Sequence, residues 1–255
     1  MATLRHSLIL IFLLATAAGE GWAQTVSGKP VPRVPDAAGW FGLFNGKDLS
    51  GWMTFDPGAW SVVGSGELSG RGPRSYLFSP GTYRNFILRV EARLNAKGDS
   101  GIVLRAALET GAPKGYEVQL CNTGADAQKT GSLYNFQKVA ETTVADDQWS
   151  KQTVAVIGNR ILIQVNGKLL VDHSRMENYF NRKGQIPRTG PIQLQTHGGE
   201  IRWRNVFIRE IGVGEANEIL ASKGGAGFKS AFNGKNFDGW AGPVKNYGVA
   251  NGEIQ

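Results

Sequence analysis

The sequence contains a single cysteine, Cys121, among its 255 residues. No disulfide can therefore form within the chain, and the fold must be stabilised by its apolar core. A lone cysteine with no His–Asn pattern nearby is better interpreted as a buried apolar residue than as a nucleophile. Helix-period segments are nearly absent beyond the N-terminus, and no later run is long enough to cross a bilayer. These absences exclude a disulfide scaffold and a bundle of membrane helices.

Patterns that bind metals or nucleotides are also missing. The histidines lack zinc-ligand spacing and the clustered loop acids are too few to enclose calcium: His6, His173, His197, Asp126, Asp146 and Asp147. The glycine-rich segments do not lie between a strand and a helix, as phosphate-binding loops do. We therefore expect no metal and no cofactor. The net charge of +7 is scattered along the chain, which favours a solvated basic surface over a nucleic-acid interface.

The N-terminal segment is typical of an export signal. Arg5 and His6 precede an apolar run at residues 7–15, and small residues follow up to Ala23. We predict a signal peptide at residues 1–23 and a periplasmic or secreted protein with no membrane span after its removal. The alternative is an uncleaved anchor. Residues 24–39 contain three prolines and little apolar content, which predicts a semi-extended tether.

From Trp40 onward, short apolar runs alternate with turns rich in glycine, and 35 glycines occur in all. Period-two alternation predicts strands, and the clearest cover residues 86–93, 101–105, 116–120, 153–165, 168–171, 192–197 and 201–209. Asn166-Gly167 is a strong hairpin-turn signal. About a dozen short strands at this spacing predict an all-β fold, a two-sheet antiparallel sandwich or jelly roll.

One segment of the sequence is repeated. Residues 44–52 (FNGKDLSGW) return as residues 232–240 (FNGKNFDGW), with six of nine positions identical. We expect a domain at residues 40–212, a linker at 213–227, and at 228–255 the truncated start of a second copy whose remainder is missing from this chain. The alternative is that the last strand pairs onto the first domain.

Several segments, in order, resemble the 3-keto-disaccharide hydrolase family. The stretches that carry the resemblance are residues 43–52, 99–105, 115–120, 130–134, 149–157, 166–167, 190–198 and 204–210. The resemblance implies a jelly roll of the concanavalin A/laminin-G type and a sugar-cleaving activity on a carbohydrate substrate. Members often carry an acidic residue where this chain has Thr196, and another after Gln119, where Leu120-Cys121-Asn122 stand here.

The alternation also predicts one polar sheet face. If the apolar partners line the core, the opposite face presents Arg89, Glu91, Arg105, Glu117, Gln119, Gln193, Gln195 and His197. Carboxylates, amides, a guanidinium and an imidazole give the dense, directional hydrogen bonding that sugar hydroxyls need, and Tyr116 and Tyr134 are candidates for stacking on a sugar ring. The alternative is the wet face of an antiparallel sandwich.

The resemblance implies cleavage by elimination followed by hydration. A ketone at C3 acidifies the C2 proton, a base removes it, and the glycosidic oxygen leaves from C1. We expect Glu117 or His197 to be the base, Arg105 to stabilise the enolate, and Gln119 and Gln195 to orient the sugar. Further substrate contacts are expected from Gln193, Tyr116, Tyr134 and Glu91. A non-catalytic carbohydrate-binding module and a structural adhesion module are the alternatives.

Overall fold

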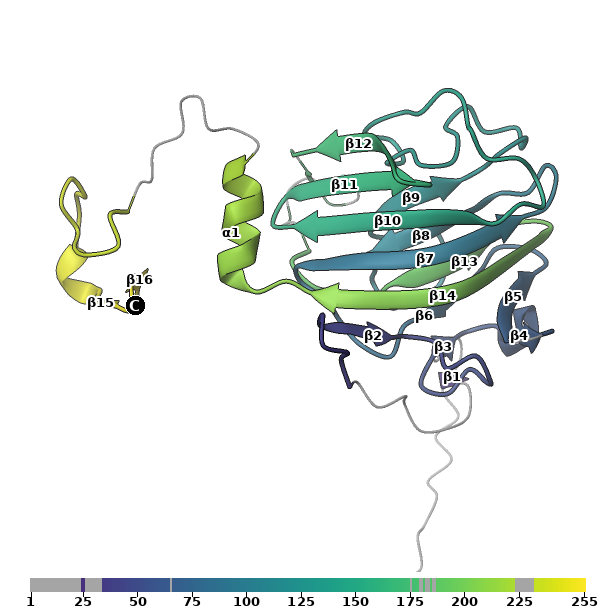
Figure 1. The fold of residues 1–255 in the computed structure, drawn as a ribbon, viewed down its shortest axis with the longest axis horizontal. Helices are drawn as coiled ribbons and strands as arrows, with labels where there is room; N and C mark the ends of the chain where they lie inside the picture. The colour runs from purple at the N-terminus through teal and green to yellow at the C-terminus, as the bar shows by residue number, and fades with distance from the viewer. Residues whose placement is uncertain are drawn as a thin grey trace, which may run out of the picture.

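The protein is a sandwich of two facing β-sheets (Figure 1). The computed structural model describes residues 24–25, 34–64, 66–174, 176–178, 181, 184, 187–222 and 232–255. The predicted signal peptide at 1–23 and half of the expected tether, residues 26–33, lie outside the described residues. Every pairing of the named strands is antiparallel in this part of the chain, and the prediction of an all-β, two-sheet jelly-roll sandwich is confirmed.

The first sheet has six strands. Their spatial order is β1 (Gln24–Thr25), β3 (Met53–Thr54), β6 (Ser75–Phe78), β13 (Gln193–Thr196), β8 (Ser100–Leu104) and β9 (Tyr116–Leu120). Strands that are distant in the chain therefore lie side by side. Gln195, for instance, is opposite Tyr76, and Ile102 is opposite both Leu194 and Val118.

The second sheet has eight strands. Seven follow the order β12 (Lys168–His173), β11 (Arg160–Val165), β10 (Ser150–Ile157), β7 (Phe86–Leu94), β14 (Glu200–Glu210), β5 (Glu67–Arg71) and β4 (Trp60–Val63). The eighth, β2 (Trp40–Gly42), pairs with β14. The turn between β11 and β12 has φ of 50° at Asn166 and 83° at Gly167, as the Asn-Gly signal predicts.

The core between the sheets consists of alternate side chains from both. On β7 the inward residues are Phe86, Leu88, Val90, Ala92 and Leu94, all at most 4% exposed. On β9 they are Tyr116, Val118 and Leu120, which leaves Glu117 and Gln119 on the outer face of the six-stranded sheet. The strand pattern thus decides which side chains reach the site.

Helix α1 (Val213–Ser222) follows the last long strand and lies inside the region expected to be a linker. Its Ala216 is buried and packs with Ile157 and Ile211, which fixes the helix against the end of the eight-stranded sheet. None of the helices in the described part of the chain has the length and apolarity that a bilayer crossing requires. The remaining helical segments are short 3₁₀ turns, η1 (Pro57–Ala59) and η2 (Val244–Asn246).

The repeated segment folds locally in the same way twice. Asn45 Oδ1 accepts the N–H groups of residues 47 and 48 at 2.8 and 3.0 Å, and Asn233 Oδ1 accepts those of residues 235 and 236 at 2.8 and 2.9 Å. Trp52 is fully buried, whereas Trp240 is 44% exposed. Strands β15 (Val249–Ala250) and β16 (Glu253–Ile254) pair with each other and, among the described residues, with no strand of the sandwich.

Candidate active site

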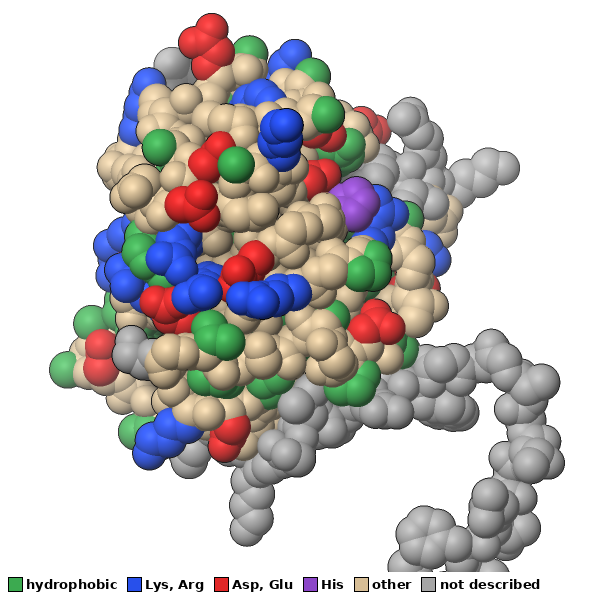
Figure 2. Space-filling view, turned by 90° about the vertical axis from the view of Figure 1, so that its right-hand side faces the viewer, with side chains coloured by type: hydrophobic (Ala, Val, Ile, Leu, Met, Phe, Trp, Pro, Cys, Tyr) green, Lys and Arg blue, Asp and Glu red, His purple; other side chains and the backbone are tan. Residues whose placement is uncertain are grey.

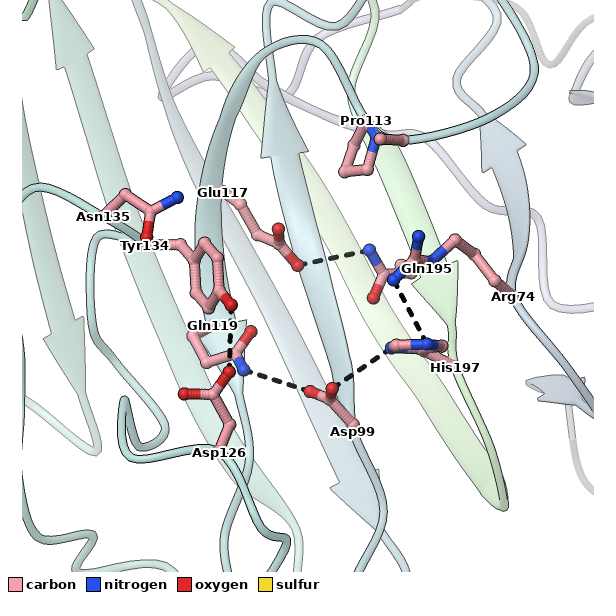
Figure 3. Close-up of a pocket in the computed structure, with 11 residues that line it drawn as sticks. Arg74, Asp99, Pro113, Glu117, Gln119, Asp126, Tyr134, Asn135, Gln195 and His197 are labelled. Atoms are coloured by element: carbon pink, nitrogen blue, oxygen red, sulfur yellow. Dashed lines mark hydrogen bonds and ion pairs between the residues drawn. The ribbon is translucent and has the colours of Figure 1, made fainter. Parts of the chain in front are cut away.

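A cavity of about 320 Å³ lies on the outer face of the six-stranded sheet (Figure 3). Strands β9 and β13, the approach to β8 and the loops after β8 and β9 supply its walls. The lining residues are Arg74, Asp99, Ala112, Pro113, Glu117, Gln119, Asp126, Tyr134, Asn135, Gln195 and His197. Nine of these eleven residues are polar or ionisable, and the other two are Ala112 and Pro113, so the cavity suits a hydroxyl-rich ligand.

Glu117 is the most deeply buried acid of this cavity, with 9% of its surface exposed. Its Oε1 accepts a hydrogen bond from Gln195 Nε2 at 3.2 Å. Burial raises the pKa of Glu117 to about 8, and the nearby Asp99 adds to this, while Arg74 and the Gln195 bond oppose it. The carboxyl group is therefore mostly protonated at neutral pH and can donate a proton.

Gly101 makes room for this carboxyl group. Gly101 lies on β8, opposite Gln119 of β9, and a Cβ added to it would collide with Oε1 of Glu117 and lie 2.8 Å from the Glu117 Cγ. Any side chain at this position would displace Glu117. The glycine in the motif of residues 99–105 is thus explained by the close approach of a functional side chain.

His197 and Asp99 form a hydrogen-bonded pair at the opposite side of the cavity floor. His197 Nδ1 lies 3.1 Å from Asp99 Oδ2, and His197 Nε2 lies 3.2 Å from Arg74 Nη2. Arginine can only donate, so Nε2 must accept from Arg74 and Nδ1 must carry the proton that Asp99 accepts. Desolvation raises the pKa of Asp99, although its interaction with His197 opposes the shift.

One hydrogen bond from an amide and one from a phenol hold Asp99 and Asp126 in place. Gln119 Nε2 donates to Asp99 Oδ1 at 3.0 Å, and Tyr134 Oη donates to Asp126 Oδ2 at 3.0 Å. The hydrogen bond from Tyr134 leaves its ring on the wall of the cavity (Figure 3). Asp99 is thus oriented by one partner on each oxygen, which is the arrangement that fixes a histidine tautomer.

A second hollow of about 220 Å³ adjoins the first and shares Arg74 and Ala112 with it. Its other lining residues are Phe55, Asp56, Tyr76, Thr110 and Gly111. Tyr76 is 5% exposed and donates from its hydroxyl to the Gly111 carbonyl at 2.7 Å, which pins the loop between β8 and β9. The half-buried Phe55 gives this hollow an aromatic wall.

The structure brings five of the nine predicted site residues together around the first cavity: Glu117, Gln119, Gln195, Tyr134 and His197. Three residues that the sequence analysis did not single out for the site, Arg74, Asp99 and Asp126, lie beside them. Asp99 begins one of the stretches that carry the family resemblance, so its position was a usable signal. Arg74 and Asp126 lie in loops, where the period-two pattern of a strand cannot predict which way a side chain points.

Arg105 is not part of this cavity, contrary to the prediction. Its φ of 50° breaks the alternation at the end of β8 and turns the side chain away from Glu117. Its Nη2 donates to the Arg84 carbonyl at 2.6 Å and its Nη1 to the Pro187 carbonyl at 3.3 Å. Arg105 therefore cannot stabilise an enolate formed beside Glu117.

Three other residues predicted to contact the substrate do not line this cavity either. Glu91 lies on the outer face of the other sheet, where its Oε2 accepts from Arg204 Nε at 2.7 Å. Tyr116 is fully buried in the core, and its hydroxyl donates to the Glu177 carbonyl at 3.1 Å. Gln193 shares the outer face with Gln195, but it is opposite Phe78 and Val103 and only 1% exposed, so it does not reach the cavity.

Within the described ranges, no three His, Cys, Asp or Glu side chains are arranged to hold a metal ion. Asp99 and His197 are already bonded to each other, and Asp126 is bonded to Tyr134. The chemistry that this cavity can perform with its own groups is proton transfer, from Glu117 and to His197.

Comparison with known proteins agrees with this geometry. Residues 39–209 match the family of the 3-keto-alpha-glucoside-1,2-lyase-like domain. A crystal structure from Parabacteroides distasonis ATCC 8503, provisionally assigned to the glycosyl hydrolases, is 26% identical with a TM-score of 0.60, covering 69% of this chain and 95% of the other.

A second protein of that organism, with the same provisional assignment, is 23% identical with a TM-score of 0.56, covering 68% of this chain and 99% of the other. None of the curated protein sequences matches the chain. The family match spans more than half of the sequence and contains the whole cavity. The chain therefore belongs to the 3-keto-alpha-glucoside-1,2-lyase-like family of glycoside-acting proteins.

Proposed function

We propose that this protein cleaves 3-keto-glycosides by elimination at its Glu117–His197 cavity. The observation that carries the proposal is that a histidine oriented by a carboxylate and a buried carboxyl group, whose pKa burial raises, open onto the same cavity. An elimination needs one group that takes a proton and another that gives one. Pairs of groups whose surroundings separate their proton affinities are typical of such acid–base sites.

His197 is the proposed base. With Asp99 holding the proton on Nδ1, Nε2 is unprotonated and its lone pair can accept a proton. Nε2 takes the proton from C2 of the sugar, and the electron pair of that C–H bond moves to form the enolate of the C3 ketone. Arg74, which donates to Nε2 in the free protein, would then turn to the enolate oxygen.

Glu117 is the proposed acid. The enolate re-forms the ketone, the bond between C1 and the glycosidic oxygen breaks, and Glu117 gives its proton to that oxygen. The products are the free alcohol of the leaving group and a sugar enone with a C1=C2 double bond. Water then adds its oxygen to C1 and a proton returns to C2, which yields the 3-keto sugar. Gln119 and Gln195 are placed to orient the hydroxyl groups during these steps.

The adjoining hollow is the proposed place for the leaving group. It shares Arg74 with the cavity of Glu117, and the ring of Phe55 offers a face on which a second sugar can stack. A substrate of two linked units fits this arrangement. Export through an N-terminal signal is a separate proposal, which rests on the apolar run at residues 7–15 and the small residues after it.

The test is incubation of the protein with a 3-keto-disaccharide and, in parallel, with the unoxidised parent disaccharide. We expect the keto substrate alone to release sugar, and an enone intermediate to absorb in the ultraviolet before hydration. With deuterium at C2 the release should slow, because that bond breaks in the elimination. If the keto-disaccharide binds without any turnover, the cavity is a carbohydrate-binding site and the catalytic proposal is wrong.

A further inference from the structure

A third cavity, of about 500 Å³, lies where helix α1 meets the end of the sandwich. None of its lining residues lines the cavity of Glu117. Its charged lining residues are Arg84, Arg105, Arg188 and Glu210, and the amides of Asn85, Asn159 and Asn217 lie among them. The proposed elimination uses none of these groups.

Arg105 lies at the inner side of this cavity and is only 3% exposed. Its hydrogen bonds go to the uncharged carbonyl oxygens of Arg84 and Pro187. Among the described residues, no carboxylate forms an ion pair with it. A buried guanidinium without a counter-charge is unfavourable, so an anion in this cavity would stabilise it.

Arg84 and Arg188 form the exposed rim. Neither makes an ion pair with any residue in the described part of the chain, so both are available to an incoming ligand. Glu210 is the acid that lines the cavity against these three arginines. The lining therefore keeps an excess of positive charge, and arginine is suited to bidentate binding of oxyanions.

The N-terminal end of α1 adds backbone donors to the same cavity, because Gly212, Val213 and Ala216 line it. The Gly212 carbonyl accepts the Ala216 N–H at 2.9 Å, so Gly212 is the residue before the helix, and it has no side chain to cap the first-turn amides. The acid of the first turn, Glu215, is bound by both Nη atoms of Arg209 at 2.6 and 2.8 Å. The backbone N–H groups at the start of a helix favour an anion.

We propose that this cavity binds a dianionic oxyanion group, a phosphate or sulfate, between Arg84, Arg188 and the first turn of α1. Arg105 provides the buried positive charge beneath it. Burial lowers the pKa of Arg105 to about 10 and the neighbouring Arg84 adds to this effect, a state that a bound anion would relieve. This inference does not depend on the elimination at Glu117.

The experiment measures inorganic phosphate binding to the whole chain by calorimetry, with sodium chloride at matched ionic strength as the salt control. We expect binding to the wild type, and a weakening of about tenfold or more in Arg188→Ala and in Arg84→Ala. Both side chains are exposed, so neither change should unfold the protein. Lys168→Ala is the matched control, because it removes an equal, exposed charge far from the cavity. Lys168 lies at the β11–β12 turn, whereas Gly158 and Asn159, which line the cavity, lie at the other end of β11.

Two outcomes would overturn the proposal: phosphate that binds no better than chloride, or an equal weakening in Lys168→Ala. A further arm compares inorganic phosphate with inorganic sulfate and with glucose 6-phosphate. Tighter binding of the sugar phosphate would support an anionic group carried by a sugar, and equal affinities would support a free oxyanion. Both of these results support the proposed anion site, and they distinguish an anionic group on a sugar from a free oxyanion.

Discussion

The outer faces of the two sheets are made of similar residues but are organised in opposite ways. On the eight-stranded sheet, the acids and arginines of β5, β7 and β14 pair with each other. Arg204 binds Glu91 at 2.7 Å, and Arg202 binds Glu67 at 3.0 Å. On the six-stranded sheet, Glu117 forms no ion pair with any of the described residues and accepts a hydrogen bond from the Gln195 amide instead. Figure 2 shows acidic and basic side chains interleaved across one side of the molecule.

The pKa directions follow from this difference. Desolvation acts on both acids, but at Glu91 the hydrogen bonds from Arg204 and Asn205 outweigh it and lower the pKa. At Glu117 desolvation prevails and raises the pKa to about 8. A carboxylate that is ion-paired with an arginine stays ionised and stabilises the sheet, whereas a buried carboxyl group without an ion-pair partner keeps its proton and can donate it. The contrast between Glu91 and Glu117 gives the following predictions, in each of which one face serves as the control for the other.

The largest effect is expected for Glu117→Gln. The amide keeps the shape and the contact with Gln195 but cannot donate a proton, so turnover of a 3-keto-disaccharide should fall by about 10³-fold. The loss should be much smaller for a substrate with a 4-nitrophenol leaving group, which departs without protonation. Steady-state assays of product release on both substrates measure this difference.

Glu91→Gln is the matched control, because it makes the same change on the other sheet and should leave turnover within about twofold of the wild type. Equal losses on the two substrates would show that Glu117 is not the acid. Unchanged turnover on both would remove it from the mechanism altogether.

The second prediction concerns stability against pH. The pKa of Glu117 is about 8 in the folded state against an ordinary value of 4.5, so the folded state holds its proton more tightly. The stability contributed by this proton is fully present below pH 4.5 and is lost as the pH rises through 8. Relative to Glu117→Gln, the wild type should therefore lose on the order of 5 kcal/mol between pH 4.5 and 9.

Urea unfolding of both proteins across this pH range gives the measurement. Relative to Glu91→Gln, the wild type should instead gain stability as the pH rises, because the pKa of Glu91 is lowered in the folded state. This contribution is present at pH values above the ordinary pKa of a glutamate and disappears as the pH falls. Parallel stability curves for the wild type and Glu117→Gln would contradict the raised pKa.

A somewhat smaller effect is expected for Asp99→Asn. Gln119 donates to Oδ1 of residue 99, so an asparagine there would turn its NH₂ group toward His197. Nδ1 would then have to accept, the proton would move to Nε2, and the base would be lost. We expect turnover to fall by about 10²-fold with little change in KM.

The control for this change is Asp48→Asn, since the repeated segment already carries Asn236 at that position and keeps the same turn. The ring nitrogens of His197, followed by ¹⁵N NMR, report the tautomer directly. A histidine that keeps its proton on Nδ1 in Asp99→Asn would contradict the proposed role of Asp99.

The comparison of the faces also explains what the sequence could and could not predict. Alternation along β9 identified Glu117 and Gln119 as outward-facing, because the period of a strand is local. It also placed Glu91 outward, correctly, but alternation does not say on which of two sheets a strand lies. The pairing of Asp99 with His197 joins residues 98 positions apart, and the positive φ of Arg105 depends on its surroundings. Neither could be read from a local pattern.

The smallest effect is expected on the paired face, for Arg204→Ala. The guanidinium binds Glu91 and lies 4.1 Å from the centre of the Trp149 ring, but its side chain is 40% exposed. Solvent screens such a pair, so the free energy of unfolding should fall by about 1 kcal/mol or less, and turnover should not change. Glu91 keeps Asn205 as a hydrogen-bond donor, which limits the loss further. Urea unfolding and the 3-keto-disaccharide assay together check this, and a loss of turnover without a loss of stability would mean that the two faces are coupled through the core.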